Sequence, residues 1–145
     1  MEYKYKFFIA GRTRNRENIL NVCKIFEDLN ISHYCFLKNE ASHKEAGLDI
    51  NDSHLADTFE SLGLDNPRVR TIFEHDLDGE KNSENFLIVL PAGKSAHIEA
   101  GIAYGMGKKC YAIGEYDVTD SLYLIFDKIF KDENELKEFL ESKNY

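Results

Sequence analysis

Apolar and polar residues alternate along the chain in blocks that predict strands and helices in turn. The clearest block spans residues 85–114 and reads NFLIVLPAGKSAHIEAGIAYGMGKKCYAIG. Its first apolar run, residues 86–90, predicts a strand buried on both faces, and Pro91 ends it. A helix with Ser95 at its N-cap follows, and a second apolar run begins at Cys110. This order predicts a right-handed βαβ unit.

The remaining blocks predict more elements of the same two kinds. Strands are predicted at residues 5–10, 31–37 and 128–130, and helices at 14–30, 52–62, 68–78, 121–126 and 132–142. Residues 38–51 predict a loop or a frayed helix, and Asp132 with Glu135 has the spacing of a capping box. The alternation predicts one doubly wound α/β domain over residues 1–145, a flavodoxin- or Rossmann-like three-layer sandwich of about five parallel strands.

Composition narrows the class of protein. The chain has 145 residues, of which 43% are hydrophobic and 30% are charged, as in an ordinary globular domain. No apolar run approaches the roughly 20 residues that span a bilayer, and residues 1–6 lack a secretory signal pattern, so we expect no membrane partner. Cys23, Cys35 and Cys110 lack metal or CxxC spacing, which predicts reduced thiols in a cytoplasmic protein. The net charge of −8 argues against a nucleic-acid polymer as partner but allows a small anionic ligand.

One glutamate stands out in the central helix. Glu99 is the only formally charged residue between Lys94 and Lys108, and its neighbours are small or apolar. Burying a carboxylate there costs several kcal/mol unless it is paired or hydrogen-bonded. Ligands of open parallel sheets bind beyond the carboxyl ends of the strands, close to this helix. Glu99 is therefore either a functional carboxylate in a cleft or a rim residue in a structural ion pair.

Several other residues are candidates for the same site. Gly11 and Arg12 directly follow the first strand, where backbone amides and a guanidinium can hold a phosphate or a carboxylate. Asp76 precedes the central strand and can approach Glu99. His97 lies near the start of the central helix, close enough to touch a ligand. The alternative for each polar side chain is solvation on an exposed face.

Three familiar motifs are excluded by their spacing. Gly93-Lys94-Ser95 is no P-loop, because Ile88 occupies the place of the first glycine. The glycines of the central helix cannot form a dinucleotide fingerprint. The five histidines include no pair with ligand spacing, so we predict no metal site.

The central run, read together with two other segments, resembles the nucleoside 2-deoxyribosyltransferase-like family, including its 2′-deoxynucleoside 5′-monophosphate N-glycosidase-like members. The segment from Glu99 to Lys108, EAGIAYGMGK, is similar to the family pattern E-x-G-x-A-x-x-x-G-K. The segment HDLDG at residues 75–79 is similar to an Asp-Leu-Asn-Gly element. The first strand, FFIAG, resembles the family's first strand with its terminal glycine.

The resemblance implies a chemistry and a set of roles. Glu99 would attack the anomeric carbon of a (deoxy)nucleoside, and water or an acceptor base would resolve the glycosyl-enzyme ester with retention. Asp76 would contact the base or assist its protonation. Gly93 and Ser95, with loop amides, would cradle the sugar or its 5′ substituent. Gly11, Arg12 and Thr13, with Lys94 and Ser95, would imitate the phosphate pocket of the N-glycosidase members. The resemblance implies neither a cofactor nor a metal.

The sequence also departs from the family pattern. Gly93 replaces an aspartate, Phe7 replaces the tyrosine that supports the nucleophile, and the asparagine donated by a neighbouring subunit has no clear match, with Asp120 or Ser121 nearest. Three functions therefore stay open: a transferase or hydrolase of nucleotide metabolism, a non-catalytic nucleotide-binding or sensing module, and an NAD-type glycohydrolase.

The small residues of the central helix bear on assembly. They permit close backbone approach, which predicts a homodimer. These residues are Ala96, Ala100, Gly101 and Ala103.

Overall fold

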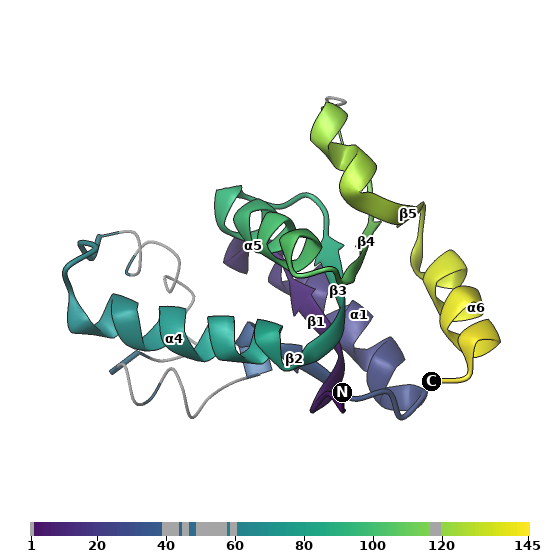
Figure 1. Cartoon of the computed structure of the whole chain (residues 1–145), viewed down its shortest axis with the longest axis horizontal. Coiled ribbons are helices and arrows are strands. Elements are labelled where there is room, and N and C mark those ends of the chain that lie inside the picture. Colours follow the sequence, from purple (N-terminus) through teal and green to yellow (C-terminus); the bar gives the residue numbers. More distant parts are fainter. Residues whose placement is uncertain (1, 39–43, 45–46, 49–57, 59–60, 117–119) are drawn as a thin grey trace.

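The structure is a computed structural model that describes residues 2–38, 44, 47–48, 58, 61–116 and 120–145. Most of the predicted loop at 38–51 and most of the predicted helix at 52–62 lie outside these residues. Figure 1 shows the arrangement of the described elements. The strands are β1 (Tyr5–Ala10), β2 (His33–Cys35), β3 (Ser83–Val89), β4 (Lys109–Ile113) and β5 (Phe126–Phe130). The helices are α1 (Arg16–Asp28), α4 (Pro67–Lys81), α5 (Lys94–Gly105) and α6 (Glu133–Lys143), with short 3₁₀ turns η1 (Thr13–Asn15), η2 (Phe36–Lys38) and η3 (Ser121–Ile125).

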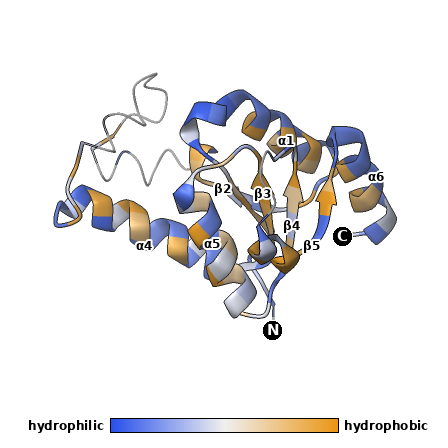
Figure 2. Cartoon of the chain, turned by 90° about the horizontal axis from the view of Figure 1, so that it is seen from above, coloured by the Kyte–Doolittle hydropathy of each residue, from blue (hydrophilic) through white to orange (hydrophobic). Residues whose placement is uncertain are grey.

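The strands form one parallel sheet with helices on both faces. The sheet has five strands in the order β2-β1-β3-β4-β5. α1 and α6 cover one face and α4 and α5 cover the other, while the largely hydrophobic strands lie between them (Figures 1 and 2). The predicted doubly wound α/β fold is confirmed. None of the described helices has the length and apolar character needed to cross a membrane.

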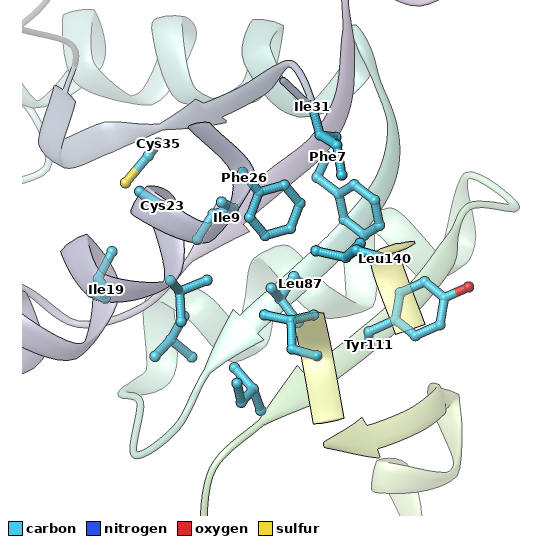
Figure 3. Close-up of a cluster of buried hydrophobic side chains, with 14 of the residues drawn as sticks. Phe7, Ile9, Ile19, Cys23, Phe26, Ile31, Cys35, Leu87, Tyr111 and Leu140 are labelled. Carbon is cyan, nitrogen blue, oxygen red and sulfur yellow. The ribbon is translucent and has the colours of Figure 1, made fainter. Parts of the chain in front are cut away.

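Alternate residues of β1 point into different layers. Phe7 lies in the layer of α1 and α6, where it packs against Phe26 at 5.0 Å between ring centroids (Figure 3). Phe8 lies in the layer of α4 and α5, stacked 5.3 Å from Tyr34. This alternation follows from the two-residue period of a strand. The layer that holds α4 and α5 therefore receives Phe8 and not Phe7.

Helix α5 packs closely on the sheet because its inner face is made of alanine. Ala96, Ala100 and Ala103 are buried against β3 and β4, whereas Gly101 is exposed. The three alanines thus pack within the chain and are not available to a second subunit, so the homodimer stays a prediction.

Two local predictions are wrong. The N-cap of α5 is Gly93 and not Ser95, because the helix already begins at Lys94. The second strand is shorter than predicted, since residues 36–38 turn into η2. By contrast, the predicted helix start at Asp132 is confirmed: Asp132 Oδ1 accepts the Glu135 N–H at 3.0 Å. The Glu135 carboxylate accepts the N–H of Lys131, one residue before the N-cap, at 2.7 Å, so the pair resembles a capping box shifted by one residue. All three cysteines are free and buried, as predicted.

Candidate active site

Two of the predicted residues, Asp76 and Glu99, lie on neighbouring helices, and the charge of one acts on the other. Asp76 lies on α4 and Glu99 on α5, and these helices contact one another on the same face of the sheet. Both side chains are half-buried. Burial raises the pKa of Glu99 well above its ordinary value, and the negative charges of Asp76 and Glu80 raise it further. No ion pair within 4.0 Å joins Glu99 to a cation in the described part of the chain.

Asp76 is held by a tyrosine from the edge strand β2. The Tyr34 hydroxyl donates a hydrogen bond of 2.9 Å to Asp76 Oδ1. The Tyr34 ring is fixed by its stack on Phe8 and by Gly79, where an added Cβ would lie 2.7 Å from the ring. Burial raises the pKa of Asp76 to about 6, although the hydrogen bond from Tyr34 opposes the shift. Asp76 therefore changes its charge close to neutral pH.

A third acid, Glu80, lies one helical turn after Asp76 on α4. Its side chain is only 1% exposed, and Oε2 has no hydrogen-bond partner among the described residues. Burial raises its pKa to about 8, Lys108 lowers it, and the charge of Asp76 raises it. Glu80 was not predicted from the sequence, where its i+4 spacing from Asp76 would place both acids on one helix face only if the helix extended to residue 80. We call Asp76, Glu80 and Glu99 the acidic cluster.

Lys108 is the cation that acts on Glu80, but its amino group donates hydrogen bonds to the backbone. Nζ donates hydrogen bonds to the carbonyl oxygens of Lys81, at 3.3 Å, and Ser83. It also lies 4.6 Å from the centre of the Tyr3 ring. Burial lowers the pKa of Lys108, while Glu80 raises it. The acids therefore have a nearby positive charge without a direct ion pair. No group of acids, histidines or cysteines in the described ranges is arranged to hold a metal ion.

The glycine-containing loops after β1 and β3 lie next to each other. β1 and β3 are neighbouring strands, and the chain leaves them toward opposite faces, into α1 and α5. The Asn15 side chain donates a hydrogen bond of 3.3 Å to the Pro91 carbonyl and ties the two loops together. Such a switch point is where open α/β sheets bind ligands.

The predicted binding residues of these loops are accessible. Arg12, Lys94 and Ser95 are exposed, and Gly11 is half-buried. A Cβ added at Gly93 would meet no atom within 4 Å, so this loop borders open space.

Both ring nitrogens of His97 have partners within the chain. Nδ1 lies 2.7 Å from the Gly93 carbonyl oxygen, which only accepts, so Nδ1 carries a proton. Nε2 lies 2.8 Å from the Tyr123 hydroxyl, and the two rings stack at 5.7 Å. His97 thus ties the start of α5 to η3 and offers no free nitrogen to a ligand.

The structure also places Phe7 and Asp120, two positions at which the sequence departs from the family pattern. Phe7 points into the opposite layer, so a hydroxyl at that position would not reach α5. The phenol that contacts the acidic cluster through Asp76 belongs to Tyr34. Asp120 caps η3, with its carboxylate accepting the Leu122 N–H at 2.8 Å, and it remains exposed.

A separate cavity lies on the other side of the sheet. Its volume is about 310 Å³, and it opens at the carboxyl ends of β3 and β4. Residues from α1 and the start of α6 line it, among them Asn18 and Asp132, but neither Asp76 nor Glu99 does.

Comparison with known proteins gives a structural likeness. No protein-family model and no curated protein matches the chain. A 2-deoxyribosyltransferase from the psychrotolerant bacterium Bacillus psychrosaccharolyticus matches with a TM-score of 0.66 and 15% identity, covering 95% of this chain and 94% of that chain. The Clostridium botulinum CMP N-glycosidase BcmB matches with a TM-score of 0.46 and 20% identity, covering 94% and 98%. The resemblance seen in the sequence is confirmed at the level of the fold, which this chain shares with the Bacillus 2-deoxyribosyltransferase.

Proposed function

We propose that the protein cleaves or exchanges the N-glycosidic bond of a (deoxy)nucleoside or its 5′-monophosphate, with Glu99 as the nucleophile. The observation that carries the proposal is the pairing of Asp76 and Glu99, two half-buried acids on adjacent helices, on the face of the sheet to which β3 leads. The fold shared with a 2-deoxyribosyltransferase supports it.

The proposed reaction uses the ionised form of Glu99. A Glu99 oxygen forms a bond to the anomeric carbon while the bond from that carbon to the base nitrogen breaks, and its electron pair stays on the base. The negative charge stabilises the oxocarbenium-like transition state, and partial burial strengthens that interaction. Asp76 contacts the base and supplies or steers its proton. Water or a second base then displaces Glu99 from the sugar.

The loops after β1 and β3 suit the rest of the substrate. In the proposal, the N-terminus of α5 and the amides around Gly93 and Ser95 hold the 5′ end of the sugar. The exposed cations Arg12 and Lys94 then pair with a 5′-phosphate. A homodimer is also proposed, because α5 exposes Ile98 and Tyr104 at 61% and 56% of their surface.

The test is a turnover assay on the purified chain. Nucleosides, deoxynucleosides and their 5′-monophosphates are incubated with and without an acceptor base, and released or exchanged base is measured by chromatography. We expect turnover by the wild type and a loss of at least about 1000-fold in Glu99→Ala, because the covalent route is removed. Glu138→Gln, which changes an exposed glutamate on α6, is the matched control and keeps full activity.

Other outcomes identify the other functions. No turnover with any substrate contradicts the proposal. Nucleotide binding that survives Glu99→Ala without product indicates a binding or sensing module. Release of nicotinamide from NAD alone indicates an NAD-type glycohydrolase.

A further inference from the structure

Tyr34 is a buried phenol whose hydroxyl group meets an acid of the proposed site. The residue is 8% exposed, and its hydroxyl donates a hydrogen bond of 2.9 Å to Asp76 Oδ1. A buried phenol needs such a partner, because its hydroxyl loses water on burial. A phenylalanine would fill the same space without that need. The bond to Asp76 therefore gives the hydroxyl a purpose that packing alone does not.

The ring of Tyr34 is held on several sides, so its hydroxyl has a fixed direction. The ring stacks on Phe8 at 5.3 Å between centroids, with 8° between the planes, and Tyr5 makes a T-shaped contact with it at 5.6 Å. From α4, Gly79 approaches so closely that an added Cβ would lie 2.7 Å from the ring. Asp76 lies one turn before Gly79 on the same helix. The packing of α4 on Tyr34 therefore brings the hydroxyl and the carboxyl group together.

The two carboxyl oxygens of Asp76 have different surroundings. Oδ1 accepts from Tyr34, whereas Oδ2 has no hydrogen-bond partner among the described residues. In the described ranges, Oε2 of Glu80 is the one polar side-chain atom that is both fully buried and without a partner. Asp76 Oδ2 therefore keeps contact with solvent, which makes it the oxygen that a ligand can reach.

The bond from Tyr34 also decides which oxygen carries the proton of a neutral Asp76. An oxygen that accepts from the phenol acts as the carbonyl oxygen of the acid, so the O–H group lies on Oδ2. The same bond favours the ionised form and lowers the pKa of Asp76, while burial raises this pKa to about 6. The other titratable groups that interact with Asp76 are His75 and Glu80 on α4 and Glu99 on α5.

We propose that Tyr34 is a positioning residue that directs the proton of Asp76 to Oδ2, the oxygen open to a departing base. The part that concerns the base rests on the function proposed above, whereas the part that concerns Asp76 does not. In the reaction, the O–H bond at Oδ2 breaks as a bond from that proton to an atom of the base forms, and the electron pair stays on Asp76. Tyr34 keeps its own proton, and its hydrogen bond strengthens as negative charge develops on the carboxylate.

The first measurement compares the ionisation of Asp76 in the wild type and in Tyr34→Phe. Carbon NMR of the carboxyl group follows this ionisation with pH, and Asp76→Asn assigns the signal by its loss. We expect the midpoint to move up from about 6 by about 0.5 to 1 pH unit in Tyr34→Phe, because the ionised form loses a hydrogen bond. Tyr116→Phe removes a hydroxyl from a residue that is 43% exposed and leaves the midpoint unchanged.

The second measurement separates the proton transfer from the rest of the reaction. The base of a deoxynucleoside takes up a proton as it leaves, whereas 4-nitrophenyl 2-deoxyriboside releases a stable anion without one. We expect Tyr34→Phe to lower kcat for the deoxynucleoside by about 10-fold, and kcat for the nitrophenyl substrate by less than about twofold, each at its optimal pH. Equal losses on the two substrates overturn the inference, because they indicate a general disturbance of the site.

Failure of the inference and failure of the proposed function give different results. A folded chain without turnover counts against the function, and the Asp76 titration then decides the inference alone. An unchanged midpoint in Tyr34→Phe overturns it. If Tyr34→Phe does not fold, the wild type answers instead: the NMR signal of the Tyr34 ring carbon that bears the hydroxyl should change with the same midpoint as Asp76. A Tyr34 signal that does not respond to that ionisation overturns the inference.

Discussion

At the scale of single residues, the acidic cluster shows how surroundings change an ordinary carboxyl group. Exposed glutamates such as Glu138 meet water, whereas Glu99 is half-buried and repelled by two other acids. Burial favours the neutral form and like charges favour it further. A carboxylate that forms under these conditions gains more from an approaching positive centre than a solvated one does. The arrangement suits chemistry in which positive charge develops on a sugar.

The first prediction concerns the pH dependence of the proposed reaction. Glu99 must be ionised, and burial with the nearby acids raises its pKa well above the ordinary value of 4.5, so the rising limb of kcat/KM lies at higher pH than an ordinary glutamate would give. Asp76→Asn removes a charge that raises this pKa, so the rising limb moves to lower pH while the maximal rate falls. The measurement is a pH profile of both proteins. A wild-type profile that is already flat above pH 5 would contradict this reading.

The second prediction concerns stability. The pKa of Glu80 is raised from 4.5 to about 8 in the folded chain, so its neutral form stabilises the fold below pH 4.5 and this contribution is lost as pH rises to about 8. Glu80→Gln removes that dependence. Urea unfolding between pH 4.5 and 8 should show the free energy of unfolding of the wild type falling relative to the variant by a few kcal/mol. Parallel curves for the two proteins would show that Glu80 is solvated like Glu138.

At the scale of elements, α4 is the helix that brings two of the acids into place. Asn66 caps its N-terminus, because the Asn66 side chain accepts the Arg68 N–H at 2.9 Å, and Pro67 occupies the first helical position. Its close approach to β2 depends on Gly79, which is buried against the Tyr34 ring. The helix therefore cannot move away from β2 without breaking the hydrogen bond from Tyr34 to Asp76.

The third prediction is a pair of glycine substitutions in two helices. Gly79→Ala places a Cβ 2.7 Å from the Tyr34 ring, so the clash outweighs the better helix propensity of alanine and costs about 1–3 kcal/mol. Gly101→Ala in α5 meets no atom within 4 Å and should stabilise the protein by roughly 0.5–1 kcal/mol. Thermal or urea unfolding measures both. Equal effects of the two substitutions would mean that α4 does not press on Tyr34.

At the scale of the whole molecule, β3 joins the two layers. Phe86 and Ile88 face α4 and α5, whereas Leu87 and Val89 face α1 and α6. Both sets are essentially inaccessible to solvent, as expected for the central strand of a parallel sheet. The site and most of the apolar core therefore depend on one strand. A substitution in β3 that disturbs its packing should affect both.

The fourth prediction follows from this central position. Leu87→Ala removes a fully buried side chain and should lower the free energy of unfolding by about 2–5 kcal/mol. Leu124→Ala, at a position that is 88% exposed, should change it by less than about 0.5 kcal/mol. Urea unfolding of both variants gives the comparison. A small effect at Leu87 would indicate that the core relaxes around the lost side chain.

Much of the fold could be predicted from periodicity, whereas the contacts of the site could not. The apolar runs at residues 5–10 and 86–90 and the small-residue helix after them lie where the pattern indicates. Tyr34 was missed because its bond to Asp76 joins segments 42 residues apart, and no local pattern records such a contact. Glu80 was missed because the predicted helix ends at residue 78, whereas α4 continues to Lys81 and packs the Glu80 side chain against its neighbours. The contact between His97 and Tyr123 was not predicted either, because Tyr123 also comes from a distant segment.

The hydrogen bond from Tyr34 to Asp76 also has an optical consequence. The chain has no tryptophan, so tyrosine supplies its intrinsic ultraviolet emission. An excited phenol passes its proton readily to a neighbouring carboxylate, which quenches its light, whereas a protonated carboxyl group does so poorly. Subtracting the emission of Tyr34→Phe from that of the wild type gives the emission of Tyr34. This emission should become weaker as pH rises through about 6, where Asp76 ionises. A single aromatic side chain would thus report the charge of its neighbour without any added label.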